Sequence, residues 1–343
     1  MHFFIHRKTE QTQIETPNTY FFEGAEKRLE VDFAETPRSS KKGMLNISRE
    51  KWEKLLSTVN CLIMSTSSTE ECEAYVLSES SLFVYAKKIL IKTCGNTTLL
   101  ECLPLLTDLA SEENLKIDYV TYSHKNFLSP ELQKPDYRSF EAEIDLLNKT
   151  FPGHGHILGP ITGDRWFIYV ADMSRNPAEK DEAEQTIEII MSQLDRNSMK
   201  NFYKNVASDG NVSERTGITD IIPGSDINDE LFDPCGYSMN GLLGRYYSTI
   251  HITPEPAFSY VSYESNFATA SYNDIIKRVL NIFKPGKFII SVFTDAAAKC
   301  GESNKAYDTQ IPGFRREFSN TCDFDGRRSV TCSHYATIPN SEN

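Results

Sequence analysis

The chain has 343 residues, of which 39% are hydrophobic and 24% charged, a composition typical of a globular protein with a sizeable core. Its net charge of −12 disfavours a nucleic-acid partner, because little excess Lys or Arg is available to neutralise phosphates. The apolar runs are far shorter than the roughly 18 residues that cross a bilayer, and residues 1–11 do not read as a signal peptide. We therefore expect a cytoplasmic protein without a membrane segment.

The first half of the chain mixes helical and extended patterns. Residues 1–19 are polar and are predicted to be a loose extension. Ser48 has the position of a helix N-cap, and Trp52, Leu55 and Leu56 follow it at helical spacing. In chain order we predict a strand at 20–22, helices at 25–31 and after Ser48, strands at 60–65, 74–84 and 88–93, a helix at 99–111, a strand at 116–123, a helix at 137–148 and a strand at 166–172.

The second half begins after a charged segment at 174–184, which is typical of a linker. The segments "NISREKWEKLLSTVNCLIMS" and "SYNDIIKRVLNIFKPGKFIISVF" echo each other. We therefore expect one domain at 20–330 made of two related halves, 20–173 and 185–330, and a disordered tail at 331–343. The predicted elements are a strand at 186–191, a short helix at 218–222, strands at 246–252 and 260–263, a helix at 272–283 and a strand at 287–293.

Cysteines in this chain show no metal-binding pattern. None stands in a CxxC pair or at zinc-ligand spacing with histidine, so no metal is expected. Without a secretory signal, free thiols are expected rather than disulfides. The eight cysteines are Cys61, Cys72, Cys94, Cys102, Cys235, Cys300, Cys322 and Cys332.

The segment around Glu79 and Ser80 interrupts two strand-forming runs. One interpretation is a polar hairpin turn, although Glu and Ser are poor turn formers compared with Asn-Gly. The other is a strained peptide bond, in which the Ser80 hydroxyl attacks the carbonyl of Glu79 and converts the amide to an ester.

Other segments carry candidate reactive groups. His251 lies near the end of an alternating strand, before Thr253 and Glu255, and is either structural or a general base. Cys94 follows an apolar strand and precedes a glycine, so it is either a buried thiol or a reactive one. A thiol hydrolase that uses Cys94 or Cys235 with His251 is an alternative, although neither cysteine has a recognised nucleophile signature.

Two further segments bear on binding. The segment 233–241, "DPCGYSMNG", is interpreted as a loop whose glycines let a backbone approach a ligand. Glu23, Glu26 and Glu30 are spaced by three and four residues, so Glu26 and Glu30 are expected to share a helical face, which is usually a solvated one.

Taken together, the motifs "FFEG", "YVLSESS", "KTCG", "DPCGYSMNG" and "TIHITPEP" resemble the eukaryotic S-adenosylmethionine decarboxylases, and the resemblance runs from residue 21 to 318. It implies an α/β fold, a four-layer α/β/β/α sandwich of two antiparallel sheets from two similar halves. It also implies self-cleavage between Glu79 and Ser80 into chains 1–79 and 80–343. Ser80 then becomes a covalent pyruvoyl group, so neither pyridoxal phosphate nor a metal is needed.

The resemblance also implies a function. The pyruvoyl group forms a Schiff base with S-adenosylmethionine and releases CO2, and the product donates aminopropyl groups in spermidine and spermine synthesis. A non-catalytic, regulatory paralogue is the alternative, but such a paralogue is expected to lose residues that this chain keeps, among them Ser80 and Cys94.

The same resemblance assigns residue roles. His251 matches the base of self-cleavage and Ser238 the residue that supports its oxyoxazolidine stage, while Cys94 matches the proton donor of decarboxylation. Glu23 and Glu26 match active-site carboxylates. For the substrate, Phe22 and Phe232 match the pair that stacks on adenine, Glu255 the ligand of the ribose hydroxyls, and Leu77 a backbone contact to the base.

An activator site is implied as well. Putrescine is expected to bind a buried acidic cluster, because neighbouring buried carboxylates repel one another and a dication relieves this. Three positions depart from the family pattern, since Thr121 replaces an aromatic residue, His124 an arginine and Glu184 the shorter aspartate. The family includes both monomers and homodimers of two-chain units, and either state is compatible with the sequence. The expected putrescine residues are Glu30, Lys92, Glu184, Thr186, Glu188, Glu264 and Phe293.

Overall fold

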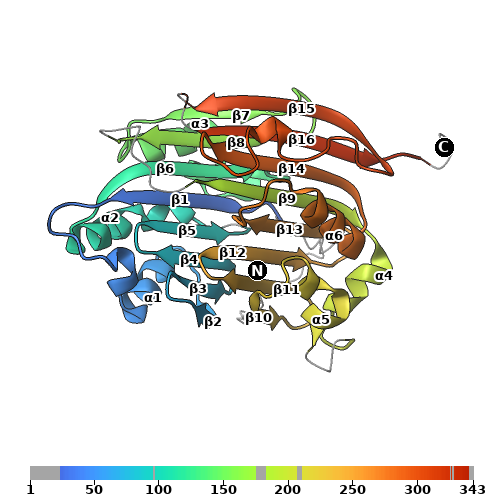
Figure 1. Ribbon diagram of the computed structural model, residues 1–343, viewed down its shortest axis with the longest axis horizontal. Helices are drawn as coiled ribbons and strands as arrows, with labels where there is room; N and C mark the ends of the chain where they lie inside the picture. Colours follow the sequence, from blue (N-terminus) through green and yellow to red (C-terminus); the bar gives the residue numbers. More distant parts are fainter. Residues whose placement is uncertain are drawn as a thin grey trace, which may run out of the picture.

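The computed structural model of the chain describes residues 24–95, 97–174, 183–206, 211–324, 326 and 328–339. Within these residues the strands form two eight-stranded antiparallel sheets, and the helices are few and short (Figure 1). Residues 1–19, the predicted strand at 20–22, most of the predicted linker, and the site residues Phe22 and Glu23 lie outside the described residues.

The first sheet is formed by β1 to β8, in the order β2-β3-β4-β5-β1-β6-β8-β7. Strands β3 and β4 form a tight hairpin, so the predicted run at 74–84 is two strands rather than one. The elements of this half are β1 (Lys27–Ala34), α1 (Arg49–Ser57), β2 (Ile63–Ser68), β3 (Cys72–Leu77), β4 (Ser80–Tyr85), β5 (Lys88–Thr93), α2 (Leu103–Glu112), β6 (Lys116–Lys125), α3 (Phe140–Asn148), β7 (His154–Leu158) and β8 (Trp166–Asp172).

The second sheet repeats this order with the strands that follow, β10-β11-β12-β13-β9-β14-β16-β15. Each strand therefore occupies the place of the strand eight earlier, which confirms the two similar halves. The elements are β9 (Gln185–Leu194), α4 (Arg196–Met199), α5 (Val212–Thr216), β10 (Asp226–Leu231), β11 (Tyr237–Leu243), β12 (Tyr246–Thr253), β13 (Tyr260–Ser265), α6 (Asn273–Phe283), β14 (Pro285–Asp295), β15 (Phe314–Phe324) and β16 (Arg328–Thr337).

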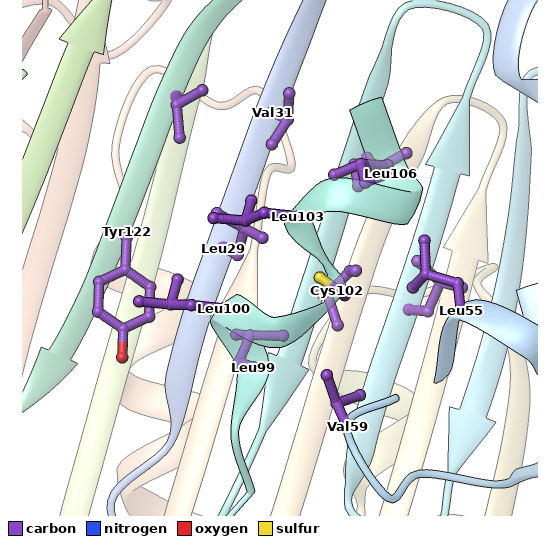
Figure 2. Packing of buried hydrophobic residues seen from close by; sticks show 14 of the residues in the cluster. Leu29, Val31, Leu55, Val59, Leu99, Leu100, Cys102, Leu103, Leu106 and Tyr122 are labelled. Atoms are coloured by element: carbon purple, nitrogen blue, oxygen red, sulfur yellow. The ribbon is translucent and has the colours of Figure 1, made fainter. Parts of the chain in front are cut away.

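The apolar cores show how the layers stack. One core joins the first sheet to α1, α2 and α3, and in Figure 2 Leu103 of α2 lies over Leu29 of β1, while Leu106 lies to one side of Val31. A matching core joins the second sheet to α6. Two smaller clusters contain residues of both sheets, so the sheets face each other and the helices lie outside. This is the expected α/β/β/α sandwich. None of the helices described could cross a membrane.

Strand β1 corrects the predicted helix at 25–31. Its charged residues alternate with Leu29, Val31 and Phe33, which is the period of a strand. The apolar side chains enter the core beneath the helices, whereas Arg28 and Glu30 face the opposite sheet. Residues four apart share a face in a strand as well as in a helix, so the two predicted glutamates do lie on one side, but that side is buried.

Two segments in the second half also differ from the prediction. The predicted disordered tail at 331–343 is wrong for Thr331–Thr337, which belong to β16 and pair with β14 and β15. Both faces of β16 are buried, and small residues such as Ser333 and Ala336 interrupt its apolar alternation. The predicted loop at 233–241 becomes β11 from Tyr237 onward. All eight cysteines are free thiols, as predicted.

Candidate active site

The peptide bond between Glu79 and Ser80 lies at the end of the hairpin of β3 and β4. Ser78 and Glu79 form a two-residue turn, and Leu77 pairs with Ser80 across it. The φ angle of Ser80 is 150°, a region that residues other than glycine avoid. Such a conformation costs on the order of 1–3 kcal/mol and has to be imposed by its surroundings. The hairpin interpretation is therefore correct and the backbone of Ser80 is strained, while the attack of its hydroxyl on Glu79 stays a prediction.

Hydrogen bonds hold both sides of this peptide bond. The backbone N–H of Cys94 donates to the carbonyl oxygen of Glu79 at 2.9 Å, which polarises that carbonyl. The Ser80 hydroxyl donates to Glu26 Oε1 at 2.9 Å. In the turn, the N–H of Ser78 donates to the carbonyl oxygen of Leu62, and the hydroxyl of Ser78 accepts from the N–H of Leu62. The scissile group is thus fixed while its hydroxyl contacts a carboxylate.

His251 comes from the opposite sheet. It lies on β12 directly across from Ser238 on β11, and Ser238 Oγ is 2.9 Å from His251 Nδ1. Its Nε2 is 3.9 Å from Glu26 Oε1. Burial lowers the pKa of His251 to about 4, although the Glu26 carboxylate opposes this shift. At neutral pH the ring is therefore uncharged and can accept a proton.

A cavity of about 340 Å³ brings these groups together. The predicted residues Glu26, Ser80, Cys94, Ser238 and His251 all line it, which is what a catalytic centre requires. The other lining residues are Gly24, Ser78, Glu79, Tyr237, Ile252, Thr253 and Tyr260.

Three predicted substrate residues are not among the lining residues of this cavity. Leu77 is buried in β3 beside the turn. Phe232 follows β10, and Glu255 lies beyond β12 next to Cys235. Both nitrogens of the His251 ring contact hydroxyl groups, and Cys235 does not line the cavity, so the geometry does not favour the thiol-hydrolase alternative.

A chain of buried ion pairs begins at Glu26 and runs between the sheets. Lys92 is completely buried, and its Nζ lies 2.8 Å from Glu264, 2.9 Å from Glu188 and 3.3 Å from Glu26. Burial alone would raise the pKa of Glu264, but Arg28 and Lys92 lower it to about 2. The pKa of Glu188 is raised by burial to about 7, so its carboxylate is the less well compensated one.

The ion pairs continue to a second cavity of about 430 Å³. Arg28 bridges Glu264 and Glu30 at 2.9 and 2.5 Å. Lys88 and Arg328 each contact Glu30, Asp32 and Glu184. Those three carboxylates lie close enough to share a metal ion, but each already contacts both Lys88 and Arg328.

The expected putrescine residues all belong to this region. Glu30, Glu184, Thr186 and Phe293 line the second cavity, while Lys92, Glu188 and Glu264 form the ion pairs beside it. Sequence reasoning missed the partner cations. The period-two pattern of β1 could have indicated Arg28, whereas nothing local connects Lys88 or Arg328 to the acids. Thr121 lines the same cavity, and His124 lies outside it, 2.7 Å from Glu143.

Lys92→Met is expected to destabilise the protein by about 3–5 kcal/mol, because it leaves three buried carboxylates without their shared cation. Urea unfolding followed by circular dichroism measures this, in a Ser80→Ala background that keeps the chain in one piece. The matched control is Lys305→Met, which breaks an exposed pair with Glu302 and should change stability by less than about 1 kcal/mol. Equal stability of the two variants would contradict the role of Lys92.

Known proteins resemble this chain along most of its length. Residues 19–336 match the profile of the family described as adenosylmethionine decarboxylase. An S-adenosylmethionine decarboxylase proenzyme from Dictyostelium discoideum is 40% identical over 332 residues, 94% of this chain and 87% of that protein. The proenzyme of the same description from Xenopus laevis is 43% identical over 314 residues, 89% of this chain and 92% of that protein. The crystal structure of the Trypanosoma brucei AdoMetDC-delta26 monomer is similar with a TM-score of 0.61 and 27% identity, covering 75% of this chain and 99% of that one.

Proposed function

The chain belongs to the eukaryotic S-adenosylmethionine decarboxylase proenzyme family, and from that membership we propose the roles of its own residues in self-cleavage and decarboxylation. Its activity is that of the family: a self-processing proenzyme becomes the decarboxylase that supplies polyamine synthesis. The observation that carries the residue roles is the backbone of Ser80. The φ angle of Ser80 is 150°, and the carbonyl of the preceding residue, Glu79, already accepts a hydrogen bond from the Cys94 N–H.

Cleavage begins with Ser80 Oγ attacking the carbonyl carbon of Glu79. Glu26 Oε1 accepts the hydroxyl proton, since that hydrogen bond is already formed at 2.9 Å. The Cys94 N–H stabilises the negative charge that develops on the carbonyl oxygen. The new C–O bond forms, the C–N bond between Glu79 and Ser80 breaks, and the amine of Ser80 takes up a proton. Ser238, which lines the cavity, supports the cyclic oxyoxazolidine stage.

The second step removes the ester. His251 takes the α-proton of Ser80, the bond between its Cβ and Oγ breaks, and Glu79 leaves as the carboxylate end of chain 1–79. The dehydroalanine that remains takes up one water and loses ammonia, which leaves a keto group at the start of chain 80–343. His251 suits this step because burial keeps its ring neutral, with a pKa of about 4.

The residues around Ser80 fit a pyruvoyl group. The small side chain of Ser80 borders a cavity that is also lined by the thiol of Cys94, the carboxylate of Glu26 and the imidazole of His251. When present, such a group supplies a sink for the electrons released with CO2. Cys94 lines the cavity and is half-buried, so its thiol can return a proton to the substrate α-carbon. Glu26 provides negative charge for the cationic substrate. Glu23, Phe22, Leu77, Phe232 and Glu255 complete the proposed substrate site.

The mass of the purified protein under denaturing conditions tests this proposal. We expect two chains, 1–79 and 80–343. The longer of them, 80–343, should lack a free amine at its start. One intact chain of 343 residues would contradict self-cleavage and would favour the regulatory-paralogue alternative.

The residues of the second cavity lead us to expect weaker activation by putrescine than the resemblance implies. Arg28, Lys88 and Arg328 line it and contact the acids that a diamine would use. We therefore propose that these cations already provide most of the positive charge that putrescine would bring. The homodimer of two-chain units remains a separate proposal.

Putrescine is expected to stimulate the parent chain less than about twofold and the Arg28→Leu variant by roughly tenfold, because the variant leaves Glu264 and Glu30 without their shared cation. Rates of cleavage and of CO2 release, each with and without putrescine, measure this. The matched control is Arg49→Leu, which loses an exposed pair with Glu53 and an exposed hydrogen bond to Thr66 and should respond as the parent does. A strongly stimulated parent, or an unresponsive Arg28→Leu, would contradict the proposal.

A further inference from the structure

Three buried polar side chains, two that contact Nε2 of His251 and one that contacts the second of these, have no role in the steps above. Thr249 Oγ1 is 2.8 Å and Ser81 Oγ 3.0 Å from Nε2. The Ser81 hydroxyl also donates to Asn240 Oδ1 at 2.6 Å. All three side chains are fully buried, so water does not satisfy them. We call Ser81, Asn240 and Thr249 the imidazole-holding cluster.

The number of protons in this cluster restricts the histidine. Ser81 has one hydroxyl proton, and the amide oxygen of Asn240 takes it. Ser81 Oγ can then only accept from its other neighbours, Thr249 at 3.1 Å and His251 at 3.0 Å. If Thr249 donated to Nε2, the lone pairs of Ser81 Oγ and Nε2 would face each other at 3.0 Å without a proton between them. The satisfied arrangement has Thr249 donating to Ser81 and Nε2 carrying a proton that both oxygens accept.

A charge close to the ring favours the same arrangement. The Glu26 carboxylate lies 3.9 Å from Nε2, and a negative charge stabilises a proton on the nearer nitrogen. Nδ1 is then unprotonated and accepts from the hydroxyl of Ser238, a residue that lines the cavity, at 2.9 Å.

We propose that Ser81, Asn240 and Thr249 are positioning residues that hold His251 in the tautomer with Nε2 protonated. Nδ1 is unprotonated in this tautomer and is the nitrogen that acts as the base. The inference rests on the proposed role of His251 in elimination. It adds a link between folding and cleavage, because Ser81 lies on β4 of the first sheet while Asn240, Thr249 and His251 lie on β11 and β12 of the second. The base is therefore in its active form only when the two sheets have docked.

The tautomer is measured directly by ¹⁵N NMR of histidine-labelled full-length chain in the Ser80→Ala background, where no cleavage intervenes. We expect His251 to show a protonated Nε2 and an unprotonated Nδ1. Asn240→Leu frees the Ser81 proton to donate to Nε2, so the Nδ1-protonated form should appear. Ser81→Ala removes one acceptor of the Nε2 proton and serves as a second variant if Asn240→Leu does not fold. An Nδ1-protonated parent, or a tautomer unchanged in both variants, would overturn the proposal.

Cleavage kinetics give the functional readout, with Ser80 intact. Thr249→Val and Asn240→Leu should slow chain release about tenfold or more, because removal of the α-proton becomes slower. The ester should then accumulate, so hydroxylamine, which cleaves esters, should split a larger share of the protein. Thr249→Ser keeps the hydroxyl and should restore the rate. Thr331→Val, which removes an equally buried strand hydroxyl bonded to Ser303 and Thr321, should cleave like the parent. Equal rates for Thr249→Val and Thr331→Val would contradict positioning.

The same measurements separate this inference from the role of His251 itself. If His251→Ala released chains at the parent rate, the proposed base would be wrong, and the NMR signals would still report whether the cluster sets the tautomer. If His251→Ala stalled but neither cluster variant changed the tautomer, only the positioning role would fail.

Discussion

Ser80→Ala should leave the chain in one piece and abolish decarboxylation. The variant has no hydroxyl to attack the Glu79 carbonyl, and an alanine cannot become the keto group on which catalysis depends. The loss should be complete in both measurements, denatured mass and CO2 release, because one atom, Oγ, is required for each. The fold should persist, since the hydroxyl makes a single hydrogen bond, to Glu26.

The matched control for this variant is Ser123→Ala. Ser123 is a buried strand serine of the same sheet whose hydroxyl has no hydrogen-bond partner among the described residues, so its removal should leave cleavage at the parent rate. A Ser80→Ala chain that still splits after Glu79 would show that another nucleophile acts, and the mechanism would be wrong.

His251→Ala should stop at the ester. Ser80, Glu26 and the Cys94 N–H remain in place to form it, but the α-proton of Ser80 has no base. A general base contributes about 10²–10⁴ to a rate, so spontaneous chain release should slow by that factor. Hydroxylamine cleaves esters and not amides, and it should therefore split the variant into 1–79 and 80–343 while leaving Ser80→Ala intact.

The control for the histidine variant is His334→Ala. His334 is also buried and lies on a strand of the second sheet, but it contacts Cys332 and Phe318 rather than the cavity. It should release chains as the parent does. If His251→Ala showed no hydroxylamine-sensitive bond, the base would act before ester formation rather than after it.

Local patterns predicted many elements and missed those whose environment is set by distant residues. The helix α6 was predicted because Ile275, Ile276 and Val279 repeat at helical spacing and are buried as that spacing requires. Strand β1 was mistaken for a helix although Leu29, Val31 and Phe33 alternate with charged residues at the period of a strand, and the pattern did not show that the charged face is buried as completely as the apolar one. Only the facing sheet, with its own charges, makes that burial tolerable.

The terminal strand β16 shows the same limit. Its residues Thr331 and Ser333 are polar yet buried between β14 and β15, where other hydroxyls satisfy them. A window of sequence contains no information about those partners, and the segment therefore read as a disordered tail.

By itself the sequence determined the family and the fold class and predicted cleavage of the bond between Glu79 and Ser80, because the motifs that carry them are short and contiguous. Only the tertiary structure decided the backbone conformation of that bond and the side chains that surround it. Ser80 and His251 are separated by about half of the chain and meet because two sheets dock face to face, and the same docking places Arg28 on Glu264 and Ser81 on His251. The physical reason is that strain, ion pairing and a histidine tautomer depend on distances between groups that no local pattern relates.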